Sequence, residues 1–187
     1  MSTQIIPSAP NARDRILSIA GPLFYREGYR AVGIDRVIAE ADVAKATFYR
    51  HFPSKDYLIV AWLNRAENSM ADQFPAADTP KALSDYVAAT LAIARGDTCM
   101  GCTFQGSAAE FGNSMHPVHL AARSVKDRLL NDLVTRAKSE QLNFPEDVAA
   151  EIFLIIEGLW ASTRMFGRDA PFNAAERAFA RIITAAR

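Results

Sequence analysis

The chain has 187 residues, of which half are apolar, so it is long enough and apolar enough to fold around a core as one unit or two small ones. Lys and Arg number 21 and Asp and Glu also number 21, which gives a formal net charge of zero. This balance excludes a protein that is basic throughout, and any surface for nucleic acid must be a local patch.

The beginning of the chain, Met1–Pro10, contains no Lys or Arg and no apolar run as long as a signal peptide needs. No later stretch approaches the ~20 apolar residues that span a bilayer. Cys99 and Cys102 are the only cysteines, too few for the disulfide framework of a secreted fold, and we expect them to stay reduced. The sequence therefore predicts a cytoplasmic protein with no membrane partner.

Apolar residues recur at helical spacing along the chain, and no segment shows the sustained alternation of a half-buried strand, so the predicted fold is all-α. The first helix is expected to start after Asn11 as its cap and to stop at Gly28, with Pro22 bending it. Its apolar face carries Ile16, Leu17, Ala20, Leu23 and Phe24.

A second short helix carries Ile34, Val37, Ile38 and Ala41 on one face, and Asp42 is a residue that tolerates the tight turn after it. A third helix restarts from Val43 with Phe48 and Phe52 facing inward. Pro53 ends it, and Ser54 caps a fourth helix that runs toward Phe74.

The stretch Pro75–Pro80 is rich in Ala, Asp and Pro and is typical of a connection. We expect the later helices near Lys81–Arg95, Cys102–Phe111, Pro117–Gln141, Pro145–Phe166 and Asn173 to the end. The predicted domains are a helix-turn-helix domain over residues 1–56 and a helical domain over residues 57–187, with the fourth helix, to about residue 74, as the connector.

The segment from Gly28 to Asp56 contains two short amphipathic helices joined by a tight turn, a geometry that can place the second helix in a DNA major groove about 12 Å wide. Lys55 adds a cation at the start of the next helix, where the helix dipole already favours a phosphate. The second helix combines small side chains with donors for base edges and phosphate oxygens. These residues are Lys45, Ala46, Thr47, Tyr49, Arg50 and His51.

The run Thr47-Phe48-Tyr49-Arg50-His51-Phe52-Pro53-Ser54-Lys55-Asp56 resembles the Thr-Leu-Tyr-x-His-Phe-x-Ser-Lys-Glu signature of the TetR family, and the resemblance extends over residues 28–58. Gly101-Cys102 and Ala108–Phe111 are similar to one branch of that family. The departures from the pattern lie at Val32, Gly33, Asp42, Ala44 and Ala46, where the family often has Thr, Ser, Gly, Ser and Gly. The hydroxyl caps are lost, so phosphate contacts near Gly33 and Ala44 would come from backbone amides.

The resemblance implies a three-helix DNA-binding domain followed by an antiparallel helical domain that binds a ligand and dimerises. It further implies a homodimeric repressor that a small molecule releases from a palindromic operator. In the family's pattern Lys45 and Ala46 meet bases, whereas Thr47, Tyr49, His51 and Lys55 hold phosphates, and Arg50 suits either role.

A ligand of this family enters between the middle helices. The candidate lining residues are Cys102, Phe104, Phe111, Phe153, Glu157, Trp160 and Met165, although apolar side chains of this kind more often belong to a plain core. Glu157 stands one turn from an aliphatic run and must find a partner, either a cationic ligand or a residue across the dimer.

The segment Val148–Phe166 is apolar around most of its circumference, and the last helix carries one clean apolar stripe. Such a pair suits a four-helix contact between two chains, so we predict a homodimer. Two recognition helices roughly 34 to 36 Å apart would then read a near-palindrome. The residues expected at the contact are Ile152, Ile156, Phe179, Ile182 and Ile183.

Three alternatives use the cysteines. With His116 and His119 they superficially resemble a zinc site, although the histidine spacing is too short for a zinc finger. Cys102 at a helix N-terminus suits a redox or electrophile sensor, and the two thiols suit a helical redox enzyme. A helical interaction module that has lost DNA binding is a further rival. Because no nucleophile elbow, phosphate loop or carboxylate pair is present, we predict no enzymatic activity, no cofactor and no bound metal.

Overall fold

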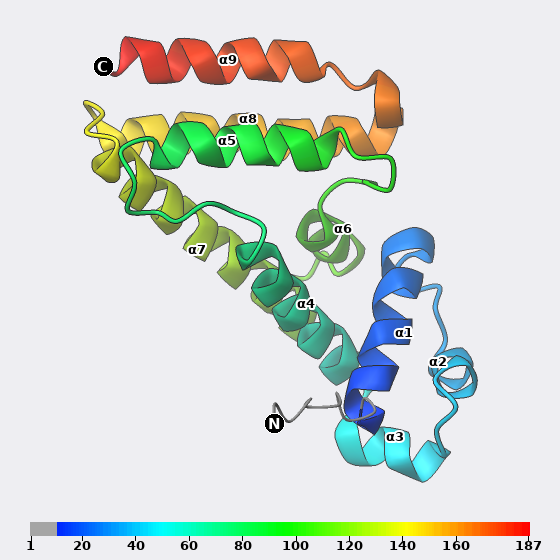
Figure 1. Ribbon diagram of the computed structural model, residues 1–187. Helices are drawn as coiled ribbons and strands as arrows, with labels where there is room; N and C mark the ends of the chain where they lie inside the picture. Colours follow the sequence, from blue (N-terminus) through cyan, green and yellow to red (C-terminus); the bar gives the residue numbers. More distant parts are fainter. Residues whose placement is uncertain (1–10) are drawn as a thin grey trace, which may run out of the picture. The chain divides into compact units, whose positions relative to one another are not determined.

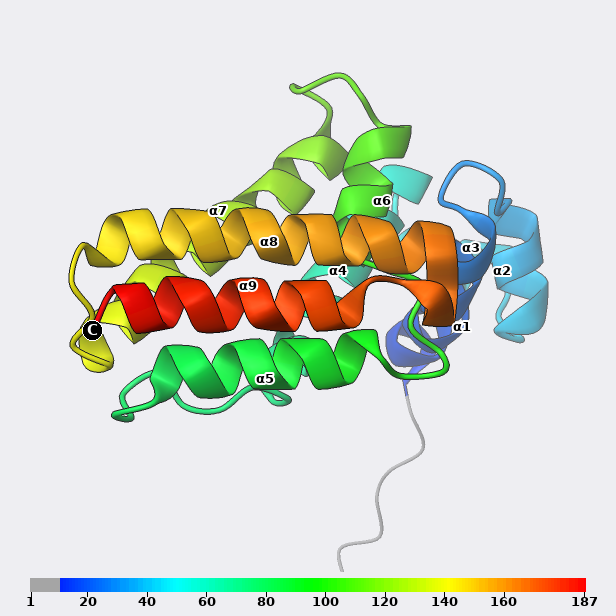
Figure 2. The same cartoon turned by 90° about the horizontal axis from the view of Figure 1, so that it is seen from above.

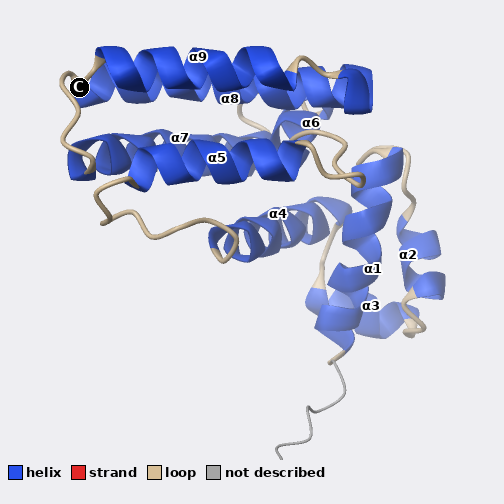
Figure 3. Ribbon diagram, turned by 45° about the horizontal axis from the view of Figure 1, so that its top comes forward, coloured by secondary structure: helices blue, strands red, loops and turns tan. Residues whose placement is uncertain are grey.

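The computed structural model describes residues 11–187, and within that range every regular element is a helix, as Figures 1 and 3 show. The predicted all-α fold is confirmed. The expectation about Met1–Pro10 falls outside the described residues. The chain divides into two compact units, Met1–Trp62 and Leu63–Arg187, which are described separately below.

The first unit contains α1 (Ala12–Glu27), α2 (Ile34–Glu40), α3 (Lys45–His51) and the first part of α4 (Lys55–Ala71). Asn11 caps α1 as predicted, because its side-chain oxygen accepts the Asp14 N–H at 2.9 Å. Gly28 ends α1 with φ of +95°, a conformation that favours glycine. Ser54 accepts the Tyr57 N–H at 3.4 Å, which supplies the expected cap of α4.

The core of the first unit collects the apolar face of each helix. A second feature is the close approach of α1 to α4, where a Cβ on Gly21 would lie 2.3 Å from the Trp62 ring. Burying each of the large side chains contributes roughly 1.5–3 kcal/mol and fixes α3 on the cluster. The buried residues include Ile16, Leu17, Leu23, Phe24, Val37, Phe48, Phe52, Leu58 and Ile59.

The second unit contains the rest of α4, then α5 (Ala82–Ala94), α6 (Thr103–Glu110), α7 (Pro117–Ser139), α8 (Pro145–Phe166), a 3₁₀ turn (Gly167–Asp169) and α9 (Phe172–Ala185). In Figure 1, α9 packs on one side of the α5–α8 pair and α7 on the other. Figure 2, seen from above, shows α8, α9 and α5 side by side.

The helix ends agree closely with the sequence prediction, and α8 has the predicted ends. The 3₁₀ turn after it was not predicted. The fourth helix stops at Ala71 instead of continuing to Phe74, because Pro75 has no N–H to donate to the Ala71 carbonyl four residues back and its ring clashes with that carbonyl. The chain tightens there into turns in which Gln73 and Phe74 donate to the carbonyls of Met70 and Ala71.

None of the helices in residues 11–187 is both long and apolar enough to cross a membrane.

Candidate nucleic-acid interface and ligand cavity

The turn between α2 and α3 depends on one residue in a left-handed conformation. Asp42 has φ of +50°, which confirms that it occupies the tight turn. The Val43 N–H donates to the Ile38 carbonyl at 3.3 Å, and an Arg15 N–H donates to the Asp42 carbonyl at 3.3 Å. These bonds fix the angle at which α3 leaves α2.

The two faces of α3 differ in character. Phe48 is fully buried and its ring centroid lies 5.9 Å from that of Phe52, so one face is anchored in the core as predicted. The opposite face is exposed and carries Lys45, Ala46, Tyr49 and Arg50, whereas Thr47 and His51 are half-buried at its edges. The structure thus brings together on one helix most of the residues expected to contact DNA.

The two helix starts in this motif lack side-chain caps. Gly33 precedes α2 and Ala44 precedes α3, and neither makes a side-chain hydrogen bond to the helix. The first N–H groups of a helix have no partner within it, so these amides can donate to an anion. The loss of hydroxyl caps expected from Gly33 and Ala44 is confirmed.

Ion pairs position the charged side chains around α3. Lys45 lies 3.3 Å from Asp35 of α2, and both side chains are well exposed. Arg36 bonds Glu27 of α1 at 2.5 and 3.0 Å and Glu40 at 2.7 Å, which ties α2 to α1. The hydrogen bond from Arg36 lowers the pKa of Glu27. The role of Arg36 is therefore to join α2 to α1, whereas Lys45 stays on the exposed face of α3.

Lys55 lies at the first residue of α4, as predicted, and is half-buried. Its ammonium donates to the Arg30 carbonyl at 2.9 Å. Residues 1–62 carry eight Lys or Arg and six Asp or Glu, a formal +2, whereas residues 63–187 carry thirteen and fifteen, a formal −2. The excess positive charge of this neutral chain is thus located in the unit that contains α3.

The second unit contains a cavity of about 240 Å³. Three of the residues expected to bind a ligand, Cys102, Phe104 and Trp160, lie in its wall. The full lining consists of Glu67, Met70, Ala71, Phe74, Tyr86, Cys102, Phe104, Val125, Lys126, Arg128, Leu129, Asp132, Arg136 and Trp160.

The other four expected ligand residues are not part of that lining. Phe111 is buried with its ring stacked on His116 at 4.6 Å, Phe153 is half-buried, and Met165 is exposed. Glu157 is half-buried. Its carboxylate accepts from Lys126 at 2.5 Å and from Gln105 at 2.8 Å, so the partner that this carboxylate needs is within its own chain.

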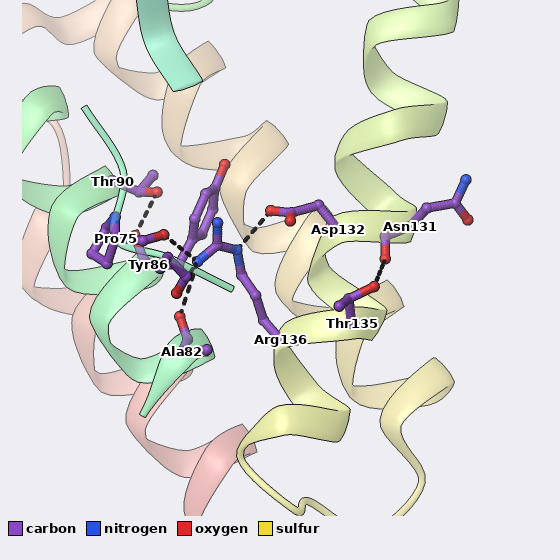
Figure 4. Close-up of polar contacts among 9 residues, drawn as sticks. Pro75, Ala82, Tyr86, Thr90, Asn131, Asp132, Thr135 and Arg136 are labelled. Atoms are coloured by element: carbon purple, nitrogen blue, oxygen red, sulfur yellow. Dashed lines mark hydrogen bonds and ion pairs between the residues drawn. The ribbon is translucent and has the colours of Figure 1, made fainter. Parts of the chain in front are cut away.

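Arg136 on α7 was missed by the sequence analysis, and Figure 4 shows how it is held. It is 6% exposed, donates to Asp132 at 2.6 Å and to the Pro75 carbonyl at 2.8 Å, and its guanidinium lies 4.6 Å from the centre of the Tyr86 ring. The Phe74 ring stacks on the Tyr86 ring, with the two centroids 4.4 Å apart. Burial raises the pKa of Tyr86 above its usual value.

Four of the five residues expected at a dimer contact require a correction. Ile152, Ile156, Phe179 and Ile183 are buried inside the chain itself, and Ile182 is half-buried. The four buried residues face the core because α9 packs on α8 and α5 within one chain, whereas the expectation for Ile182 stays a prediction. The same two helices expose a different apolar stripe, which on α8 consists of Leu154, Gly158, Ala161 and Met165.

The cysteines and histidines do not form a cluster. Cys102 is buried before α6 and Cys99 is half-buried, and both are free thiols. His116 accepts the Val118 N–H and so caps α7, and His119 lies 2.9 Å from the Phe111 carbonyl. Among residues 11–187, no three His, Cys, Asp or Glu side chains lie together as a metal site would require.

Comparison with known proteins identifies a family and a solved structure that resemble this chain. The family model described as bacterial regulatory proteins, tetR family, matches residues 16–62, which include α2 and α3. A TetR-family transcriptional regulator from Streptomyces coelicolor has the same fold along nearly the whole chain, with a TM-score of 0.84, 28% identity, and coverage of 94% of this chain and 95% of that one. Residues 16–62 thus match the TetR family, and the chain as a whole has the fold of a TetR-family regulator.

Curated relatives match the N-terminal part of this chain. The regulator QacR of Staphylococcus aureus is 31% identical over 64 residues, which is 34% of each chain. The repressor KstR of Rhodococcus jostii is 47% identical over 53 residues, which is 28% of this chain and 25% of KstR. The chain thus aligns with about a third or less of the length of these two relatives.

Proposed function

We propose that this TetR-family protein is a DNA-binding transcriptional regulator, a repressor of its operator that a small molecule releases, and not an enzyme. The observation that carries the proposal is α3, whose inner face is locked by Phe48 while Lys45, Ala46, Tyr49 and Arg50 are presented to solvent. The match of residues 16–62 to the family's DNA-binding domain and the name of KstR as a repressor support it.

The proposed DNA contacts follow from these positions. Lys45 and Ala46 lie at the start of the exposed face and meet base edges, Lys45 as a donor to guanine and Ala46 against a thymine methyl. Tyr49, Thr47, His51, Lys55 and the backbone amide at Gly33 hold phosphates, and Arg50 is free to do either.

Binding to duplex fragments from the protein's own locus tests the proposal. Fluorescence anisotropy should give specific binding whose logarithm falls linearly with the logarithm of salt concentration, as phosphate contacts require. Lys45→Ala should weaken specific binding by about 1–3 kcal/mol, and Arg123→Ala, an exposed change on α7, should leave it unchanged. A protein that ignores every fragment, or binds without salt dependence, contradicts the proposal.

We also propose a homodimer. On α9, small or apolar residues at helical spacing form a matching stripe, in which Ala174 and Ala185 are exposed and Ala178 and Ile182 are half-buried. Leu154 is 68% and Met165 76% exposed, so the two helices offer an uncovered apolar face to a second copy.

Light scattering tests the dimer. Leu154→Glu should yield monomers and lose operator affinity, because two tethered heads bind far more tightly than one. The control Leu120→Glu, also at an exposed leucine but on α7, should stay dimeric. A wild-type monomer, or a dimeric Leu154→Glu, would contradict this interface.

The cavity is the proposed effector site. A second candidate signal is chemical modification of Cys102, favoured by the position of its thiol in the cavity wall. If modification is the signal, an electrophile should release wild-type protein from its operator and leave Cys102→Ser bound. Release of both proteins to the same extent would contradict the thiol mechanism.

A further inference from the structure

The walls of the cavity are dominated by aromatic and aliphatic groups. Four rings contribute to it, from Phe74, Tyr86, Phe104 and Trp160, and the last three are nearly fully buried. Ring systems of this kind gain free energy from stacked and edge-on contacts with another ring. The cavity is therefore shaped by groups that favour a flat apolar guest.

The cations at the wall are already neutralised inside the chain. The guanidinium of Arg128 donates to both carboxylate oxygens of Glu67 at 2.6 Å. It also donates to the Ser124 hydroxyl. Lys126 is paired with Glu157 at 2.5 Å, and both side chains are largely buried.

The third cation is neutralised in the same way, because Arg136 is paired with Asp132 at 2.6 Å. The two carboxylates of the lining, Glu67 and Asp132, are thus members of these pairs as well. A charged guest would lose its hydration without finding an unpaired opposite charge, and that desolvation is costly.

The size of the cavity limits the guest further. An apolar cavity of about 150 Å³ holds a single benzene ring. A volume of about 240 Å³ is thus suited to one or two fused rings.

We propose that the effector of this protein is an uncharged aromatic compound of one or two rings. This inference rests on the proposed function, in which the cavity is the effector site. It names the class of ligand, whereas the family resemblance gives only the existence of a ligand.

Isothermal titration calorimetry of the full chain with three matched probes tests the charge of the ligand. The probes are 2-naphthol, 2-naphthoate and 2-naphthylmethylammonium, which share a ring system and differ in charge at pH 7. We expect 2-naphthol to bind and each charged probe to bind at least tenfold more weakly. Equal or tighter binding of either charged probe, or no binding of 2-naphthol, overturns the proposal.

A second pair of variants tests the location. Leu129 and Leu130 are half-buried neighbours on α7, but only Leu129 lines the cavity. Leu129→Trp should fill the space and weaken 2-naphthol binding at least tenfold, and Leu130→Trp should leave it within twofold. If the two variants behave alike, the probe binds elsewhere and the proposal fails.

Removing a neutralising charge tests the reason for the selectivity. In Glu157→Gln the Lys126 ammonium loses its counter-charge, while the amide oxygen can still accept from Gln105. The affinity for 2-naphthoate should then rise at least tenfold and that for 2-naphthol should stay within threefold. The control Glu146→Gln removes an exposed pair with Lys138 and should change neither. An unchanged naphthoate affinity in Glu157→Gln contradicts the charge argument.

Operator binding in the same samples separates the two proposals. If specific DNA binding is present but the neutral probe does not bind, the ligand class is wrong and the regulator stands. If the probe binds with the expected selectivity but no specific DNA binding is found, the proposed function fails and the ligand class stands.

Discussion

The buried guanidinium of Arg136 gives the sharpest prediction about stability. It joins α7 to the segment after α4 through the Pro75 carbonyl, to Asp132 through an ion pair, and to α5 through the Tyr86 ring. Arg136→Met keeps an apolar stem of similar length but removes all three interactions. The Pro75 carbonyl then loses this donor, and so does Asp132, whose side chain is 37% exposed.

The expected loss is large. Deleting one partner of a fully buried ion pair costs about 3–5 kcal/mol, and because Asp132 is 37% exposed we expect about 3 kcal/mol here, with the cation–π contact included. For a chain of this size, 1 kcal/mol corresponds to about 2–4 °C in Tm, so Arg136→Met should melt roughly 10 °C lower. Arg136→Lys should lie between the two proteins, because a single ammonium cannot replace the planar fork.

Urea unfolding followed by circular dichroism measures this difference in the free energy of unfolding. The matched control is Arg123→Met on the same helix, where the pair with Asp127 is 3.7 Å long and both side chains are exposed. That change should cost less than about 1 kcal/mol. If Arg136→Met and Arg123→Met unfold at the same urea concentration, the structural role assigned to the buried arginine is wrong.

Three further predictions concern single side chains. Ala44→Ser supplies α3 with the cap that it lacks and should raise the free energy of unfolding by about 0.5–2 kcal/mol. The control Ala39→Ser, within α2, should not raise it. Equal melting curves for the two variants would contradict this prediction. Asp35→Asn frees Lys45 and removes a carboxylate beside the proposed DNA surface, so affinity for a random duplex should rise several-fold in anisotropy titrations, and a fall would refute the assignment. Burial alone would raise the pKa of Glu140. The hydrogen bonds from Ser84 and the ion pair with Arg187 outweigh burial, so the pKa lies below its usual value. Glu140→Gln should therefore lower the free energy of unfolding at pH 7, and the loss should shrink as the pH falls below about 4. A difference in urea midpoint between wild type and variant that is the same at pH 7 and pH 3 would argue against this.

Much of the first unit could be predicted because its signals are local. The Asn11 cap, the left-handed residue at Asp42 and the inward position of Phe48 each depend on a few neighbours in sequence, and the structure confirms them. The same locality explains why the later helices were predicted almost to their ends: their Pro and Gly boundaries and apolar periodicity are properties of short segments.

The cavity could not be predicted in the same way, because its charged residues pair across the fold. Glu67 and Arg128 are far apart in sequence, and neither has a feature that points to the other. Arg136 lies in a helix of mixed composition, where an arginine usually faces solvent. The apolar stripes also left the choice between core and interface open. The packing of α9 on α5 and α8 decides it, since that packing buries Phe179 and Ile183 within one chain.

The two tryptophans are distributed one to each unit, and this has a practical consequence. Trp62 packs over Gly21 in the first unit, and Trp160 lines the cavity of the second. Indole fluorescence depends on the surroundings of the ring, so the wild-type emission spectrum combines a signal from each unit. Trp160→Phe leaves a fluorophore that follows only the first unit, and Trp62→Phe leaves one that follows only the second unit. The chain therefore carries built-in optical probes that can tell whether the halves melt together or one after the other.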